Sequence, residues 1–318
     1  MATDNTLAAT SGSQRRVSLY PEPMVTGPNS GKHKQSFIIL HGRGSTGEKF
    51  GTELLATAVP GHGDLQNAFP DARFMFPTAY KRRAQAFNRT PIHQWFDVWL
   101  VKEPGVRDEL QFEGLRETTG YIHELLRAEI NVVGAQNVIL WGLSQGCAAS
   151  LIAALLWQGE GLAAVVGTCG WLPLRKCIED AADEPTITAE YDEEDPFYRA
   201  DDGGPDASSS PGGCTSKLEK AVAYLREVLD LLPTGPTLCT VEAIPIFLGH
   251  GAEDDRVPIQ LAKDAAGLLG QLGTEVTYRE YRDLGHWYSA PMLADLVQFL
   301  HTKMGRCAAG TPQEEPVL

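Results

Sequence analysis

The segment Gly142-Leu143-Ser144-Gln145-Gly146 constrains the fold of this chain more than any other. An apolar run of strand length, 137–141, leads into it, and a stretch rich in small residues and leucine, 147–157, follows. This pattern predicts a strand, a sharp turn and a helix. A serine at such a turn has a strained backbone and an exposed hydroxyl, and a Cβ on either glycine would collide with the strand or the helix. We therefore predict that Ser144 is a nucleophile, in preference to a glycine-rich turn with an incidental serine.

A nucleophilic serine needs a histidine base, which in this arrangement follows the serine and an acidic residue in the chain. Three histidines lie downstream of Ser144: His250, His286 and His301. His286 follows the predicted strand 276–281, whereas His250 ends a strand, where it is expected to bond its own turn. His301 lies in a predicted terminal helix and is expected at the surface. His286 is therefore the predicted base.

The acid is expected in the loop after the predicted strand 244–251. Three acidic residues stand there: Glu253, Asp254 and Asp255. An open α/β sheet places its active site beyond the carboxyl ends of its strands, where this loop and the loop carrying His286 both fall. Asp254 is preferred, but composition alone does not separate the three.

A glycine-rich loop, 41–47, follows the predicted strand 37–40. Its three glycines let backbone N–H groups turn inward, as the binding of a developing oxyanion requires. Such a loop can instead hold phosphate, but the glycine spacing of dinucleotide-binding folds and the Lys-Ser/Thr pair of a P-loop are both absent. We predict that this loop completes an oxyanion hole with the helix N-terminus after Ser144.

Helices and strands alternate through most of the chain, which predicts a mainly parallel sheet with helices on both faces. Further strands are expected at 73–76 and 163–166, and further helices at 113–130, 259–272 and 291–304.

Taken together, these segments resemble the acyl-protein thioesterase and lysophospholipase branch of the phospholipase/carboxylesterase group of α/β-hydrolases. The matching pieces occur in order at 40–47, 76–79, 95–97, 142–146, 170–175, 250–258 and 285–286. The resemblance implies an α/β-hydrolase fold, with a mostly parallel sheet flanked by helices. It also implies that no metal or organic cofactor is required.

The resemblance further implies a catalytic triad and an oxyanion hole made of two backbone N–H groups. These residues are Ser144, Asp254 and His286 for the triad, and Arg43 and Gln145 for the oxyanion hole. It selects Asp254 among the three acids because this residue stands four positions after His250, where the family's aspartate falls. Arg43 replaces a usual leucine, so its side chain is expected to bring a positive charge to the mouth of the site.

Several apolar side chains are expected near that mouth, where they would suit an acyl chain. They are Trp95, Trp171, Leu172 and Trp287. The alternative is that these side chains close the core, which is the favoured interpretation for the neighbouring Phe96. Exposed aromatic side chains around the mouth would also suit a homodimer.

The predicted reaction is hydrolysis of a carboxylic ester or thioester through an acyl-enzyme, as in an acyl-protein thioesterase or a lysophospholipase. The substrate would be a small molecule, a lipid or a lipidated protein. One alternative is a carboxylesterase of small or secondary-metabolite esters. A further alternative, a non-enzymatic ligand-binding protein on a hydrolase scaffold, is disfavoured because all three triad residues are present.

Composition limits the partners and the compartment. The formal charge of −14 argues against a nucleic acid partner, because phosphate contacts need clustered lysine and arginine. No uninterrupted apolar window reaches the ~18 residues of a transmembrane helix. Residues 1–13 lack the basic start and apolar core of a signal peptide. The six cysteines show neither metal-binding nor disulfide spacing. We expect a cytoplasmic protein with free thiols.

Domain organisation is predicted as one hydrolase domain over 16–304, after a disordered N-terminus, 1–15, and before a flexible tail, 305–318. A segment at 176–243 appears as an insertion, because the resembling family has a short connection there. Between Glu179 and Asp206 it holds 12 acids and one base, Arg199. Disorder is therefore expected over 179–213. A metal site is disfavoured, because the ligand spacing of a calcium loop is missing.

The last part of this insertion, 217–232, carries one apolar stripe at helical spacing. The favoured interpretation is a helix that packs on the hydrolase core. The alternative is a lid over the acyl pocket.

Overall fold

The computed structural model describes residues 20–185, 216–232 and 240–308. Within them lies a sheet of seven strands in the order β1-β3-β2-β6-β7-β8-β9. Neighbours from β3 to β9 run parallel, and β1 alone pairs antiparallel, with β3. The strands are β1 Met24–Thr26, β2 Gln35–Leu40, β3 Ala72–Phe76, β6 Val138–Leu143, β7 Ala164–Thr168, β8 Ile246–Gly251 and β9 Val276–Tyr281. The predicted mainly parallel sheet is confirmed.

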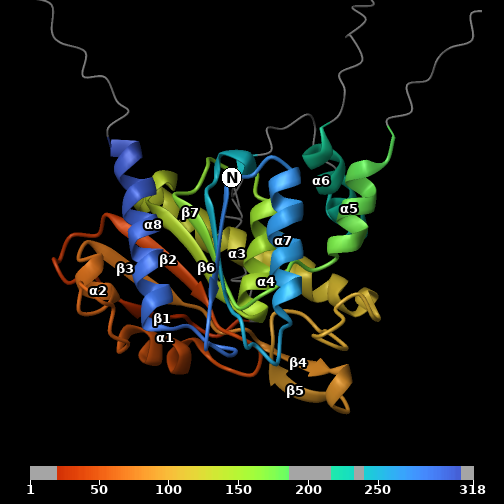
Figure 1. Cartoon of the computed structure of the whole chain (residues 1–318), viewed down its shortest axis with the longest axis horizontal. Helices are drawn as coiled ribbons and strands as arrows, with labels where there is room; N and C mark the ends of the chain where they lie inside the picture. Colours follow the sequence, from red (N-terminus) through yellow and green to blue (C-terminus); the bar gives the residue numbers. More distant parts are fainter. Residues whose placement is uncertain (1–19, 186–215, 233–239, 309–318) are drawn as a thin grey trace, which may run out of the picture.

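A separate antiparallel hairpin, β4 Lys81–Ala84 and β5 Thr90–His93, projects beside the sheet (Figure 1). The α-helices are α1 Gly47–Leu55, α2 Leu65–Ala68, α3 Phe112–Val133, α4 Gln145–Leu155, α5 Arg175–Asp183, α6 Lys217–Val228, α7 Ile259–Gln271 and α8 Ala290–Ala308. Short 3-10 turns lie at η1 Gln85–Phe87, η2 Asp108–Gln111, η3 Ala135–Asn137 and η4 Thr240–Ala243. In the described ranges, no helix combines the length and apolar character needed to cross a membrane.

Helices cover both faces of the sheet. Successive strand residues point to opposite sides, so apolar strand side chains pack against helices on each face. Ile38 and Leu140 belong to one buried cluster, which they share with apolar residues of α3, α4 and α7. Ile39 and Trp141 belong to a second cluster, which contains residues of α1 and α8. Figure 1 accordingly shows α8 on one side of the strands and α4 and α7 on the other. Each central strand is buried along its whole length, as parallel strands between two helical layers are.

Helix α6 packs on the core. Ser216 begins it with a capping box, in which the Ser216 side chain accepts from the Glu219 N–H and the Glu219 carboxylate accepts from the Ser216 N–H. Leu218 and Leu225 are fully or almost fully buried and belong to the same cluster as Ile178 of α5. Figure 1 shows α6 beside α5, at the end of the molecule away from the β4–β5 hairpin. These contacts agree with the core-packing interpretation of this helix rather than with a lid.

Two boundaries of the predicted disordered segments are wrong. Helix α5 occupies 179–183, which were expected to be disordered, because Ile178 and Ala182 lie one turn apart and are both buried. Helix α8 reaches Ala308, so it includes the first residues of the predicted flexible tail. The remaining predictions of disorder or flexibility, for 1–15, 186–213 and 309–318, lie outside the described residues.

Candidate active site

Ser144 lies at a sharp turn between β6 and α4. Its backbone has φ 56° and ψ −119°, a strained conformation for a residue with a side chain. A Cβ on Gly142 would come within 2.2 Å of Gly146 at the start of α4, and a Cβ on Gly146 would come within 2.4 Å of the Leu40 carbonyl oxygen at the end of β2. The predicted strand, turn and helix are confirmed, and both glycines are required by close approach of the backbone.

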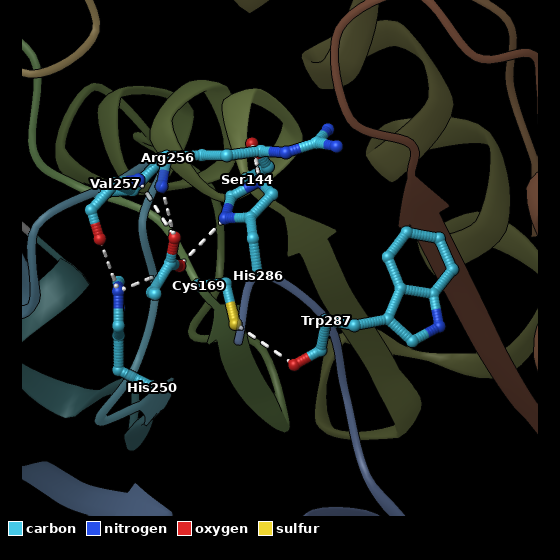
Figure 2. Close-up of polar contacts among 8 residues, drawn as sticks. Ser144, Cys169, His250, Arg256, Val257, His286 and Trp287 are labelled. Carbon is cyan, nitrogen blue, oxygen red and sulfur yellow. Dashed lines mark hydrogen bonds and ion pairs between the residues drawn. The ribbon is translucent and has the colours of Figure 1, made fainter. Parts of the chain in front are cut away.

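The structure brings the three predicted triad residues into one hydrogen-bonded chain, in which Figure 2 shows Ser144 beside His286. His286 Nε2 lies 2.9 Å from Ser144 Oγ, and His286 Nδ1 lies 2.7 Å from Asp254 Oδ2. Their loops follow β6, β8 and β9, which are parallel strands, so all three loops emerge at the same edge of the sheet. Contact between side chains as distant in sequence as Ser144 and His286 follows from this topology.

Asp254 is buried and accepts hydrogen bonds at both carboxylate oxygens. Oδ1 accepts from the backbone N–H groups of Arg256 and Val257, at 2.9 and 2.8 Å. Oδ2 lies near His286 and also 3.1 Å from His250 Nε2. Burial by itself would raise the pKa of Asp254, but the hydrogen bonds from His250, His286 and Val257 outweigh it and hold the pKa well below its usual range. The carboxylate therefore stays ionised at neutral pH.

The contact between His250 and the acid, Asp254, was not predicted from the sequence. The expectation that it bonds its own turn is confirmed, since its Nε2 lies 2.9 Å from the Val257 carbonyl oxygen. The same nitrogen also faces the Asp254 carboxylate. The spacing of four residues between His250 and Asp254 was the signal that could have indicated this contact. His301 is exposed in α8, as predicted.

Arg43 and Gln145, whose backbone N–H groups are the predicted oxyanion hole, border the same cavity as Ser144. Gln145 is the first residue of α4, where an N–H group has no carbonyl partner within the helix. Among the residues that the structure describes, neither of the two N–H groups donates to a backbone carbonyl. The loop that carries Arg43 is fixed by hydrogen bonds from Gly44 N–H to the His93 carbonyl and from Ser45 N–H to the Gly42 carbonyl.

The Gln145 side chain ties α4 to a distant segment. Its Nε2 donates to the Phe96 carbonyl at 2.7 Å, and its Oε1 accepts from the Trp95 N–H at 3.0 Å. Because all these groups are buried, the side chain holds the first turn of α4 in a fixed position. This clamp joins residues about fifty positions apart and left no local signal in the sequence.

Trp95 and Leu172 do not lie where the sequence analysis expected them. Trp95 is fully buried, and its indole N–H donates to the His41 carbonyl at 2.7 Å, so it supports the loop before Arg43 from inside the core. Leu172 is also buried and does not border the cavity. The sequence pattern placed both near the mouth but did not reveal which way each side chain points. The interpretation of Phe96 as a core residue is confirmed.

Trp171 and Trp287 do border the cavity, as expected. Trp287 is 42% exposed, whereas Trp171 is almost fully buried. The cavity has a volume of about 270 Å³. Its apolar walls are Phe50, Val101, Leu143, Trp171, Val257 and Trp287. Its polar lining residues include Ser45, Arg43 and Arg256.

An α/β-hydrolase carries its serine, acid and histidine in this chain order, on loops past the carboxyl ends of sheet strands. The fold and the site together define a serine hydrolase of the α/β-hydrolase class. A family model described as Phospholipase/Carboxylesterase matches residues 22–199 and 228–304, and the chain belongs to that family.

The chain is similar to proteins named acyl-protein thioesterase 1 from two yeasts. It is 26% identical over 270 residues to the protein from Kluyveromyces lactis, which covers 84% of this chain and 91% of that protein. It is 29% identical over 170 residues to the one from Schizosaccharomyces pombe, which covers 52% of this chain and 70% of the relative. The crystal structure of Zea mays acyl-protein thioesterase 2 aligns with a TM-score of 0.61 at 21% identity, over 90% of this chain and 100% of that one. The two yeast relatives agree with the resemblance seen in the sequence, and the maize structure supports the fold.

Proposed function

We propose that this protein hydrolyses carboxylic esters or thioesters by transferring the acyl group to Ser144. The observation that carries the proposal is the hydrogen-bonded chain Ser144–His286–Asp254, next to backbone N–H groups that have no backbone carbonyl partner in the described chain. A serine hydroxyl is a weak nucleophile until a base accepts its proton, and the orientation of the base depends on its other nitrogen.

In the first half of the reaction, His286 acts as the base. Its Nδ1–H donates to Asp254, so its Nε2 is free to accept the proton of the Ser144 hydroxyl. The Ser144 oxygen attacks the substrate carbonyl and forms a tetrahedral oxyanion. The intermediate then collapses, the bond to the alcohol or thiol breaks, and His286 returns the proton to that leaving group. Water deacylates Ser144 by the same steps.

The oxyanion would be bound by the backbone N–H groups of Arg43 and Gln145. Each such donor typically lowers the barrier by ~3 kcal/mol. The Gln145 side-chain clamp and the fixed loop around Gly44 keep both donors in place before substrate arrives. Preorganisation of this kind avoids a reorganisation cost during the reaction.

The relatives' names favour a thioester as substrate. A thiolate, with a free-thiol pKa of about 8.5, leaves more readily than an alkoxide. The apolar edges of Trp171 and Trp287 would contact the acyl group. We propose an acylated protein or lipid as the acyl donor on this basis.

A second candidate is a carboxylesterase of small esters. The cavity volume of about 270 Å³ lies just below the ~300–1,000 Å³ common for ligand sites, so only a short acyl group would be enclosed. A long chain would have to extend past Trp287 into solvent.

Matched ladders of oxygen esters and thioesters with increasing acyl length separate these candidates. Thioester preference with rates that rise along the ladder would support the thioesterase, and a maximum at short oxygen esters would support the carboxylesterase. Ser144→Ala and His286→Ala should each abolish turnover, whereas His301→Ala, a change of an exposed histidine in α8, should retain it. Full turnover by folded Ser144→Ala would refute the proposed nucleophile.

We further propose one hydrolase domain over 16–304 in a reducing, cytoplasmic setting. Cys147, Cys169 and Cys177 are free thiols, and burial raises the pKa of Cys147 and also that of Cys169, to about 12. Cys214, Cys239 and Cys307 lie outside the residues whose side chains are described. A homodimer through exposed aromatic side chains such as Trp287 stays a prediction, which a measurement of mass in solution tests.

A further inference from the structure

Two arginines are among the residues that line the active-site cavity, and they come from different loops. Arg43 follows β2, and Arg256 follows β8. The residues that line the cavity include no aspartate or glutamate. The cavity therefore carries two positive charges within a chain whose formal net charge is −14. Charge of one sign around a low-dielectric cavity concentrates ligands of the opposite sign.

Arg43 is half-buried, and its guanidinium makes few polar contacts. Its guanidinium lies over the Phe87 ring, and its one hydrogen bond, to the Val98 carbonyl, is long at 3.4 Å. In the described chain it forms no ion pair, whereas the buried Arg82 lies 2.7 Å from Glu117. Burial lowers the pKa of Arg43, because a guanidinium away from water is costly, and the charge of Asp97 offsets only part of this effect. An anionic ligand would reduce the cost that remains.

Arg256 stands beside the triad. Its backbone N–H donates to Asp254, which fixes the position of its Cα relative to the catalytic residues. Its side chain is exposed and makes no hydrogen bond or ion pair with any residue that the structure describes. Figure 2 shows it extended past Ser144 and His286, with the guanidinium directed away from Val257. The Arg256 side chain is therefore not held by the fold, and it is available to a ligand.

We infer that the site takes esters or thioesters that carry a carboxylate or phosphate close to the scissile carbonyl, and that Arg43 and Arg256 bind this anionic group. The inference rests on the proposed hydrolase function and names its substrate class. Guanidinium groups bind carboxylate and phosphate through charge-assisted hydrogen bonds that are stronger than neutral ones. The short cavity places such a group within reach of the arginines while the carbonyl lies at Ser144. The anion can belong to the acyl part or to the leaving group.

Two pairs of substrates test this inference and distinguish the two sources. The acyl pair is the 4-nitrophenyl monoester of glutaric acid and 4-nitrophenyl pentanoate, which have the same chain length. The leaving-group pair consists of the pentanoate esters of 3-carboxy-4-nitrophenol and of 4-nitrophenol. For each pair the measured quantity is the ratio of kcat/KM for the anionic ester to that for the neutral ester, after correction for spontaneous hydrolysis.

We expect this ratio to exceed one in at least one pair and to fall about tenfold in Arg256→Gln and in Arg43→Gln. The preference should also weaken as salt is added, because part of the site is open to water. Arg127→Gln is the matched control. It removes an exposed arginine of α3 that does not border the cavity, and it should leave the ratio unchanged.

A ratio that stays the same in both variants, for both pairs, would overturn the inference. If neutral esters are still hydrolysed in that case and Ser144→Ala is inactive, the proposed hydrolase function stands and only the anionic substrate class fails. If no ester is hydrolysed by the native protein, the proposed function is wrong, and the inference that rests on it is wrong as well. A ratio that changes only for the leaving-group pair assigns the anion to the alcohol or thiol.

Discussion

His250 and Asp254 form a buried contact behind His286, the proposed base, with 3.1 Å between His250 Nε2 and Asp254 Oδ2. Both side chains are fully buried. The His250 Nε2 also lies 2.9 Å from the Val257 carbonyl, so its N–H group is shared between that carbonyl and the carboxylate. His250 therefore holds the oxygen of Asp254 that accepts from His286.

We predict that His250→Phe lowers kcat about tenfold with little change in KM, because Asp254 loses a donor that orients it and His286 is less well positioned. His250→Gln, whose amide can still donate, should recover a large part of the loss. Steady-state kinetics of both variants, with thermal unfolding measured in parallel, check this. Equal stability losses in both variants with no loss of kcat would show that His250 is merely structural.

Much of the fold was predictable because its signals are local. The apolar runs of β2, β6, β7 and β8, the alternating pattern of β9 and the glycines around Ser144 can be recognised within a few residues. Asp254 could not be separated from Glu253 and Asp255 by such signals, and only the resemblance to a family selected it. In the structure it differs from them by its burial and by the hydrogen bonds it accepts.

The remaining features depend on contacts between distant segments. Helix α1 was not predicted because it contains Gly47 and Gly51, which are unfavourable in helices. A Cβ on Gly47 would come within 2.0 Å of the Phe76 carbonyl oxygen, so this glycine permits close packing of α1 on the end of β3. Trp95 was misplaced for a similar reason, since its orientation is set by His41 and Gln145.

Gly146→Ala tests the close approach of the backbone at the turn that carries Ser144. The new Cβ would meet the backbone oxygens of Leu40 and His41 at 2.4 and 2.8 Å, and backbone atoms cannot move aside as a side chain can. We expect a loss of more than about 2 kcal/mol in the free energy of unfolding, together with a large loss of kcat. Urea denaturation measures the first.

Gly120→Ala is the control for that experiment. Gly120 lies in α3, and its Cβ would meet no heavy atom within 4 Å. Alanine there should stabilise the protein by about 0.5–1 kcal/mol through helix propensity. If both alanines have the same small effect, the close approach at Gly146 is unimportant.

Leu225→Ala distinguishes a core helix from a lid at α6. Leu225 is fully buried in the cluster that contains α5 residues, and no residue of α6 borders the cavity. The free energy of unfolding should fall by about 2–5 kcal/mol, with acyl-chain preference unchanged. Glu227→Ala, an exposed change on the same helix, should alter stability by less than about 0.5 kcal/mol. A change of chain preference in Leu225→Ala would favour the lid.

His41 should make the protein sensitive to mild acid. Its ring is fully buried, and its Nε2 accepts the Ala79 N–H at 3.0 Å, which only a neutral ring can do. Burial lowers its pKa to about 4, below the value of about 6.5 in an unfolded chain. The unfolded state therefore binds the proton more readily, so this contribution to stability is complete above about pH 6.5 and is lost as the pH falls toward about 4.

Between about pH 7.5 and about pH 5 the loss of stability from this histidine should be ~2 kcal/mol. His41→Gln keeps an acceptor for Ala79 but cannot titrate, so its free energy of unfolding, measured by urea denaturation at both pH values, should fall by ~2 kcal/mol less than that of the native protein. An equal fall in the two proteins would mean that His41 does not contribute to the acid response, because the other titrating groups are common to both.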